Sequence, residues 1–269
     1  MKKILIALLL LLSINTCYAK SIDIDYNDGI YKIILNGNKI KKKVKFVTSE
    51  SLISNAEAHK LARSQLTVNA GFFDPNNGKT ISYIVTDRNI SADPMFNEAL
   101  LFNPVLKKNL DKILNRTEFR IVECDNKYRY EIVPHKDNVE FGCNIITSAQ
   151  GGPMILPELR LEEEFFIVKD EEGNIIRESA SVLHKVARTI IGTKDGNAYI
   201  LIFTDKHPAD LYEVQQYCRG LGLERAMAFD GGSSTSMNYK KQIEVISTKG
   251  DGGGRLLKSF MVITKNKRF

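Results

Sequence analysis

The stretch that most constrains this chain is Ala226-Met-Ala-Phe-Asp-Gly-Gly-Ser-Ser-Thr-Ser-Met237. Its first four residues predict a short buried strand, and Asp230 stands where that strand ends. Two glycines and four hydroxyl residues follow, and glycine allows a positive φ and lets the backbone approach a ligand closely. An acid at the mouth of a buried strand is placed to do chemistry or to hold a polar ligand. The alternative is an ordinary Asp-Gly turn between strands.

The N-terminus predicts export. Two lysines precede an apolar run, Ile4 to Leu12, that is too short to span a bilayer, and a small residue stands at Ala19. We therefore expect a signal peptide over residues 1–19 and a mature protein that is periplasmic or secreted, without a transmembrane anchor. Cys17 offers a lipoprotein as the alternative, but the two residues before it fit a lipidation site poorly.

The net charge of +6 comes from scattered basic residues, apart from the lysine-rich segment Lys39 to Lys45. That segment can meet an anionic polymer or a membrane surface. Lysines that protect an exposed hairpin edge are the interpretation we favour. No aromatic residues alternate with the lysines, so the sequence gives no argument for nucleic acid as a partner, and it does not indicate an oligomeric state.

Three cysteines follow the predicted signal peptide. In an oxidising compartment Cys124 and Cys143 can bridge across a hairpin, which leaves Cys218 unpaired on a helix. The odd number keeps this pairing open. No CxxC pattern occurs and the histidines are far apart, so nothing resembles a zinc site.

Hydrophobic alternation and turn signals predict a mixture of strands and helices. Residues 22–40 read as a hairpin with turns at Asp28-Gly29 and Asn36-Gly37. A helix is expected over Ser54 to Gln65 with Asn55 as its cap, and a second one from Leu211 to Gly220 or Gly222, begun by a capping box of Asp210 and Glu213. The expected strands are Val44–Val47, Ile81–Thr86, Ala99–Asn103, Glu118–Glu123, Tyr128–Val133, Asn197–Phe203, Gln242–Ser247 and Leu256–Thr264, with strands also on both sides of Gln150-Gly-Gly-Pro153.

The predicted fold class is α/β (α+β), a single domain with a mixed β-sheet flanked by helices and an active site at clustered strand ends. No linker divides the chain confidently. We expect a signal peptide over 1–19, an N-terminal β-hairpin region over 20–44 and the main domain over 45–269. The acidic segment 157–183 reads as a surface excursion.

Several predicted strands end in glycine or polar clusters: Asn69-Ala-Gly71, Gln150-Gly-Gly152, Thr204-Asp205 and Asp230-Gly-Gly232. Arg188 begins another strand. Each cluster alone is compatible with a turn, but together they predict a ligand site, because ligands of open α/β sheets bind where such ends gather.

Four ordered motifs resemble those of the phosphodiester glycosidase family: Asn69-Ala-Gly-Phe-Phe-Asp74, Gln150-Gly-Gly-Pro-Met-Ile-Leu156, Ala187-Arg-Thr-Ile-Ile-Gly192 and Phe229-Asp-Gly-Gly-Ser-Ser-Thr-Ser-Met237. The resemblance spans roughly residues 45 to 265 and implies a single α/β domain that hydrolyses a sugar-1-phosphodiester. It departs from the family at Ala70 and Ser233, where the family usually carries glycine.

The resemblance and the residue chemistry together suggest roles. Cleavage of a sugar from phosphate builds oxocarbenium character at the anomeric carbon, which the Asp230 carboxylate can stabilise or attack, or serve by activating water. The leaving phosphomonoester is already stable as an anion, so it needs less help from a general acid. Asp205 or Asp74 is the expected second carboxylate, and Arg188 is expected to bind the phosphate.

The remaining candidates would bind substrate. Asn69 and Gln150 can fix sugar hydroxyls, and Phe72 or Phe73 can stack on a sugar face. Arg255 and the backbone amides around the glycines can hold phosphate. The full predicted substrate-binding set is Asn69, Gly71, Phe72, Phe73, Asp74, Gln150, Gly151, Gly152, Gly231, Gly232, Ser233, Ser234 and Arg255. No cofactor is indicated, and a divalent cation at the carboxylates stays open.

The leading hypothesis is an exported hydrolase acting on a sugar-1-phosphodiester in a glycan or glycopolymer. A glycan-binding or wall-binding protein that keeps the pocket with weakened catalysis is the second hypothesis, since Ala70 and Ser233 add side chains to the motifs. A hydrolase of ordinary glycosidic bonds is the third.

Overall fold

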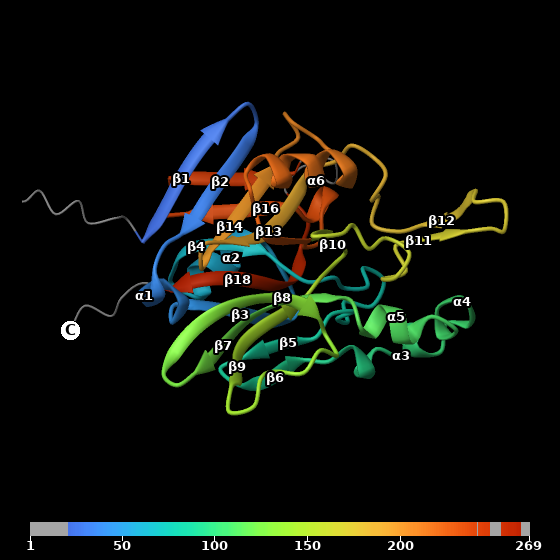
Figure 1. Ribbon diagram of the computed structural model, residues 1–269, viewed down its shortest axis with the longest axis horizontal. Coiled ribbons are helices and arrows are strands. Elements are labelled where there is room, and N and C mark those ends of the chain that lie inside the picture. The colour runs from blue at the N-terminus through green and yellow to red at the C-terminus, as the bar shows by residue number, and fades with distance from the viewer. Residues whose placement is uncertain (1–20, 241, 248–253, 265–269) are drawn as a thin grey trace, which may run out of the picture.

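The computed structural model describes residues 21–240, 242–247 and 254–264. The predicted signal peptide lies outside these residues. The described chain folds mainly into β-sheets, with short helices packed against them (Figure 1). No helix of the described chain is long and apolar enough to cross a membrane.

The first sheet has six strands in the order β1 (Ile22–Asn27), β2 (Ile30–Leu35), β14 (Asn197–Phe203), β13 (Arg188–Lys194), β15 (Arg225–Ala228) and β10 (Met154–Leu156). The second runs β17 (Ile243–Ile246), β16 (Ser236–Tyr239), β4 (Ser64–Asn69), β18 (Leu257–Thr264) and β3 (Val44–Ile53). The third runs β6 (Asn89–Ala92), β5 (Ile84–Thr86), β9 (Asn144–Gln150), β7 (Thr117–Cys124) and β8 (Lys127–Pro134). A separate hairpin consists of β11 (Ile167–Lys169) and β12 (Ile175–Glu178).

Every pairing between these strands is antiparallel. The expected mixed sheet is therefore wrong, and three sheets replace it. Antiparallel strands need only short turns, and the turn pairs Asp28-Gly29 and Asp195-Gly196 supply them with residues at positive φ. The hairpin at 22–35 is not separate, because β2 pairs with β14 in the first sheet.

The helices are α1 (Asn38–Lys41), α2 (Asn55–Leu61), α3 (Glu98–Leu101), α4 (Pro104–Lys107), α5 (Leu110–Leu114) and α6 (Leu211–Gly220), with short 3₁₀ turns η1 (Pro94–Phe96) and η2 (Gly232–Ser234). The capping box of Asp210 and Glu213 is confirmed at α6. At α2 the cap is Ser54, whose side chain accepts the Glu57 N–H, and not Asn55.

Residues 99–103 were expected to form a strand, and this expectation is wrong. Asn97 accepts the Leu100 N–H and begins α3, and Asn103 with Pro104 begins α4 directly afterwards. Side-chain caps and a proline at the first helical position favour helix over the apolar run between them.

One hydrophobic core joins all three sheets. Ile33 of the first sheet, Phe46 and Val68 of the second and Phe119 of the third are buried in the same cluster. Burying such a side chain contributes about 1.5–3 kcal/mol. A second cluster, with Leu201 and Cys218 among its members, fills the opposite face of the first sheet beneath α6.

The cysteine expectations are confirmed where the structure describes them. Cys124 and Cys143 form a disulfide between the end of β7 and the turn before β9. Cys218 is free and buried in α6, and burial raises the pKa of its thiol to about 12. Cys124, Glu140 and Cys143 are also the one group of possible metal ligands found in the described chain, but the disulfide removes both thiolates from that role.

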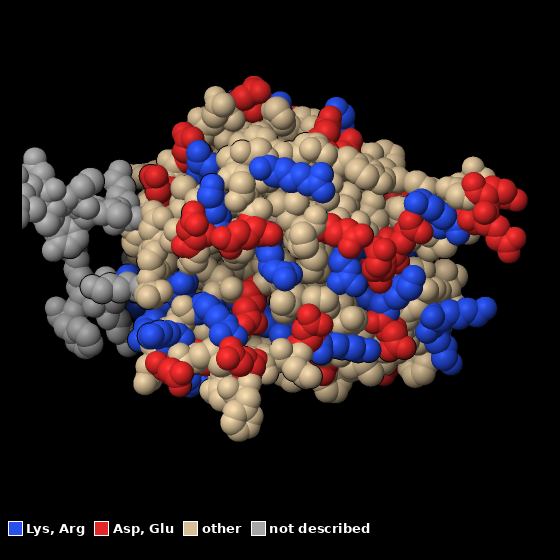
Figure 2. All heavy atoms as spheres, viewed as in Figure 1, with Lys and Arg blue, Asp and Glu red and all other residues tan. Residues whose placement is uncertain are grey.

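Lysines of the segment Lys39 to Lys45 contact aromatic rings and an acidic side chain. Lys41 is buried, its ammonium group lies 4.9 Å from the centre of the Tyr130 ring, and Lys42 covers Tyr128 in the same way. Lys45 pairs with Asp87. On the face in Figure 2, basic and acidic side chains are interspersed, so no broad surface of one sign appears there.

Candidate active site

Asp230 lies just after β15, in the loop that leads into η2. Its backbone N–H donates to the Ala70 carbonyl at 3.0 Å, and the Phe229 N–H donates to the Thr189 carbonyl at 2.9 Å. Asn69 donates from Nδ2 to the Asp230 carbonyl at 2.6 Å. The loop is therefore held where the ends of β4 and β13, from two different sheets, come together.

The Asp230 carboxyl is half-buried. Ser234 donates a hydrogen bond from Oγ to Oδ2 at 2.7 Å. Burial raises the pKa of Asp230 to about 6, while hydrogen bonds from Ser234 and the Gly231 N–H and the charge of Arg255 lower it. At neutral pH the group is mainly a carboxylate, which can stabilise positive charge, attack as a nucleophile or accept a proton.

Asp230 lines a cavity of about 280 Å³ together with Arg116, Arg177 and Arg255. Asp230 is the one carboxylate of this lining within the described residues, and Ser179 is its other polar side chain. Three guanidinium groups beside one carboxylate leave an excess of positive charge in a confined space. Such a cavity favours an anionic ligand.

Arg116 is buried at 7% exposure, and its guanidinium lies 4.0 Å from the centre of the Phe166 ring. Its Nε donates to the Glu164 carbonyl at 3.0 Å, the only hydrogen bond of this side chain to the described residues. Burial and the nearby charge of Arg177 lower the pKa of Arg116 to about 10, although Glu164 raises it. Both Nη groups therefore keep donors for a ligand.

The other two arginines also lie over aromatic rings. Arg177 lies 4.2 Å from the centre of the Phe165 ring and donates from Nη1 to the Phe165 carbonyl at 3.0 Å. Arg255 lies 5.1 Å from the centre of the Phe73 ring and donates from Nη1 to Ser233 Oγ at 3.4 Å. Cation–π contacts hold the planar forks in place.

The predicted aromatic pair lies at this cavity, since Phe72 and Phe73 both line it. They pack into different clusters, as expected for neighbours whose side chains point to opposite sides. Phe72 packs against Phe166, with 5.7 Å between the ring centres.

Arg188, the predicted phosphate ligand, is buried behind the cavity. Nε donates to the Ala209 carbonyl, and the Nη groups donate to the carbonyls of Ala180, Ser181 and His184. Burial lowers the pKa of Arg188 to about 10. In this structure its Nη groups hold the loop after β12 and its Nε holds Ala209 before α6. Arg188 is not among the residues that line the cavity of Asp230.

Asn69 and Gln150 also face inward. Asn69 is 1% exposed, and besides Asp230 it bonds the Thr189 hydroxyl and the Ser236 N–H. Gln150 is completely buried and donates from Nε2 to the carbonyls of Leu114 and Arg116. Both amides position segments around the cavity, and neither lines it.

The glycines allow the strand ends to pack closely. A Cβ on Gly151 would lie 2.6 Å from the Ala228 carbonyl oxygen, and one on Gly71 would lie 2.9 Å from the Gln150 carbonyl oxygen. Both contacts are shorter than real Cβ atoms tolerate, so packing alone requires glycine at both positions. Gly152 and Gly232 have positive φ.

The expected amide cradle is already hydrogen-bonded within the protein. The N–H groups of Gly151, Gly152 and Gly232 donate to the carbonyls of Thr117, Ala228 and Ala187. The Gly231 N–H donates to the Asp230 carboxyl. The hydrogen-bond donors that the cavity offers to a phosphate are therefore guanidinium groups.

The two candidates for a second carboxylate lie outside the cavity lining. Asp205 accepts a hydrogen bond from Ser247 Oγ at 2.9 Å. Asp74 accepts the Asn76 N–H at 2.9 Å and begins a turn.

Sequence reasoning missed Arg116 and Arg177. Arg116 follows α5, and Arg177 lies on β12 in the segment expected to be a surface excursion. That expectation is wrong in part, because Phe166 and Val182 of this segment are buried in a core cluster. The apolar run Phe165-Phe-Ile-Val168 was the available signal.

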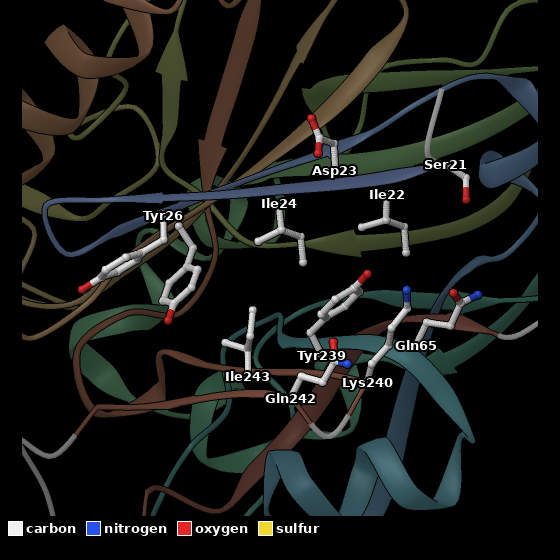
Figure 3. Close-up of a pocket in the computed structure, with 11 residues that line it drawn as sticks. Ser21, Ile22, Asp23, Ile24, Tyr26, Gln65, Tyr239, Lys240, Gln242 and Ile243 are labelled. Atoms are coloured by element: carbon white, nitrogen blue, oxygen red, sulfur yellow. The ribbon is translucent and has the colours of Figure 1, made fainter. Parts of the chain in front are cut away.

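A larger hollow of about 590 Å³ lies elsewhere, between β1 and the turn of β16 and β17. Figure 3 shows Ile22 and Ile24 pointing toward Ile243 and Tyr239 across this hollow, while Asp23 points the other way. No arginine is among the described residues that line this hollow. The cavity that brings Asp230 together with three arginines is therefore the candidate active site.

The three sheets and this cavity define a β-sheet protein in which one carboxylate and three guanidinium groups line the same cavity. The chain belongs to the phosphodiester glycosidase family, whose model matches residues 62–264. This membership supports a hydrolase that acts on phosphodiester-linked sugars. A search of curated proteins found no match.

Solved structures show the same fold at low identity. The zebrafish N-acetylglucosamine-1-phosphodiester α-N-acetylglucosaminidase catalytic domain, auto-inhibited by its pro-peptide, aligns with a TM-score of 0.63 and 13% identity over 91% of this chain and 82% of that one. A hypothetical protein from Synechocystis aligns with a TM-score of 0.54 and 13% identity over 90% of this chain and 61% of that one. A putative exported protein from Burkholderia pseudomallei aligns with a TM-score of 0.55 and 9% identity over 88% of this chain and 74% of that one.

Proposed function

We propose that this protein is an exported glycosidase that hydrolyses a sugar-1-phosphodiester and releases free sugar and a phosphomonoester. The observation that carries the proposal is the Asp230 carboxylate in one cavity with three arginines. Family membership supports the same reaction class.

Arg116, Arg177 and Arg255 bind the phosphate in this mechanism. They neutralise the charge that grows on the phosphate as the bond between the anomeric carbon and the bridging oxygen breaks. The electron pair leaves with the phosphomonoester, which needs no proton at that moment. Asp230 stabilises the positive charge on the anomeric carbon, and water supplies the new hydroxyl and releases one proton.

The test is release of phosphomonoester from sugar-1-phosphodiesters by the purified mature protein, with and without EDTA. Asp230→Asn should lower kcat/KM by about 10²–10⁴-fold, the range of a lost catalytic carboxylate. Asp87→Asn is the matched control, because Asp87 pairs with Lys45 outside the cavity. The EDTA arm tests for a divalent cation.

Thermal unfolding separates a catalytic loss from misfolding. The folded pKa of Asp230, about 6, lies above the ordinary aspartate value of 3.8. The folded protein therefore binds more protons than the unfolded chain between these values, and ionisation of Asp230 lowers stability as the pH rises through this window. The shift corresponds to at most about 3 kcal/mol. Asp230→Asn should thus melt at an equal or higher temperature than wild type at pH 7.5.

Unchanged turnover in Asp230→Asn would remove Asp230 from the mechanism. A folded wild-type protein that binds these compounds without product release would support the binding-protein hypothesis instead.

A further inference from the structure

The lining of the Asp230 cavity is of two chemical kinds. Asp230 and the three arginines are charged. Ile81, Leu100, Leu106 and Ile113 are aliphatic, and all four belong to or pack against one hydrophobic cluster, called the apolar wall below. A wall of aliphatic side chains offers no hydrogen bonds, so it suits a ligand part that is itself apolar.

The apolar wall begins beside the proposed phosphate-binding arginines. Leu100 and Ile113 are buried in one cluster with Phe165, and Arg177 lies over the Phe165 ring. Ile113 also comes three residues before Arg116 in the chain. A phosphate held by Arg116 and Arg177 would therefore have aliphatic side chains of the same cavity within reach of its second ester group.

The same helical segment is unusually apolar on its outer surface. Met95, Phe96, Phe102 and Val105 are 47%, 76%, 73% and 64% exposed. Four of the thirteen large exposed hydrophobic side chains of the described chain thus fall within eleven residues. Single exposed hydrophobic residues are normal, whereas a group of them marks an interaction surface.

This surface lies at one end of the molecule, on η1, α3 and α4 (Figure 1). Lys107 and Lys108 follow at the end of α4 and are exposed. Exposed aromatic side chains near basic residues suit the interface of a bilayer, and the exposed Glu98 of α3 offsets one of the two lysine charges. Leu100 and Leu106 of the apolar wall lie within two residues of the exposed Phe102 and Val105 in the chain, so the wall and the exposed surface share one short segment.

We propose that the substrate is a sugar-1-phosphate lipid, whose alkyl chain lies on the apolar wall while Phe96, Phe102 and Val105 enter the bilayer that holds it. The inference rests on the proposed function and narrows it, because the second ester group becomes a long alkyl chain. A cavity of about 280 Å³ lies at the lower end of ligand-pocket volumes, so the rest of a larger substrate extends beyond it. Water attacks the anomeric carbon, the bond from that carbon to the bridging oxygen breaks, and the lipid phosphomonoester stays in the bilayer.

The first experiment compares synthetic phosphodiesters that share one sugar and differ only in a methyl, butyl or octyl ester, each below its micelle concentration. A methylene buried on the wall raises kcat/KM by up to about fourfold. We expect octyl to exceed methyl by at least about tenfold. Equal kcat/KM across the series would overturn this inference and leave the proposed function intact. No turnover of any member would instead count against the proposed function.

The second experiment uses vesicles of phosphatidylcholine with a minority of phosphatidylglycerol, carrying the sugar phosphodiester of a dialkyl lipid. The double variant Phe96→Ser, Phe102→Ser should lower the ratio of vesicle turnover to methyl-ester turnover in solution by about tenfold or more. Phe141→Ser is the matched control, because Phe141 is fully exposed in the turn between β8 and β9, away from α3 and α4 (Figure 1). An equal ratio in the double variant and in the control would overturn the role of this surface.

Discussion

Replacing Ser234 with alanine tests whether the ionisation of Asp230 controls activity. The substitution removes the hydrogen bond from Ser234 Oγ to Asp230 Oδ2, 2.7 Å long, which lowers the pKa of Asp230. A hydrogen bond to a charged group contributes about 1.5–3 kcal/mol, and about 1.4 kcal/mol corresponds to one pKa unit. Water can replace part of this hydrogen bond in a half-buried site. We therefore expect the pKa of Asp230 to rise by about one unit, from about 6 toward 7.

The assay is kcat/KM for a sugar-1-phosphodiester between pH 5 and 8.5. Wild-type activity should fall as the pH drops through about 6, because the carboxylate becomes protonated. In Ser234→Ala this acid limb should move up by about one pH unit, while the plateau at high pH changes little. Asp87→Asn is the control for the position of the limb, since Asp87 pairs with Lys45 and lies outside the cavity lining.

An acid limb that stays in place in Ser234→Ala, or moves to lower pH, would refute this reasoning. The ionisation that limits the rate would then belong to another group, and Asp230 would lose its role as the carboxylate at the anomeric carbon. A lower plateau with an unmoved limb would show that Ser234 only supports the loop.

Two further predictions concern groups outside the cavity. Arg188→Met should destabilise the protein by about 3 kcal/mol or more in urea unfolding, because four carbonyls lose a buried charged donor; a loss of activity with unchanged stability would show instead that Arg188 binds phosphate. Replacing both Cys124 and Cys143 with serine should cost about 3 kcal/mol, as expected for a loop closed over 19 residues, and leave kcat/KM of the folded protein unchanged. Equal urea midpoints before and after this change would contradict the stabilising role.

The sequence predicted local structure well where a short-range signal determines it. The turn at Asp28-Gly29 and the capping box at Asp210 act within a few residues, and both appear as expected. The position of Asp230 after a buried strand is also a short-range signal, because the apolar run and the glycines that follow are adjacent in the chain. Sheet pairing is not local, and nothing in the residues at each strand end separated parallel from antiparallel neighbours.

The candidate site also depends on both short-range signals and contacts between distant segments. The motif residues Asn69, Gln150 and Arg188 have side chains that bond the protein itself. Asn69 holds the Asp230 loop, Gln150 holds the segment that contains Leu114 and Arg116, and Arg188 holds the loop after β12 together with Ala209. A polar residue next to glycine has the same appearance in sequence whether it bonds a ligand or a backbone carbonyl. Burial decides between the two, and burial depends on contacts between distant segments. The departure at Ala70 is similar, since its methyl group is buried in the main core.

The division between motif residues and cavity arginines also bears on what selects the substrate. The motifs form and support the Asp230 loop, whereas Arg116, Arg177 and the apolar wall come from segments 79–116 and 157–183, outside every motif. Motif resemblance can therefore support the reaction class without identifying the ester group that leaves. If the apolar wall selects an alkyl chain, relatives with the same loop and different residues in these two segments should share the chemistry and differ in the leaving group. Exchanging segment 94–114 between two such proteins should change the preference for ester chain length and leave the acid limb near pH 6 in place.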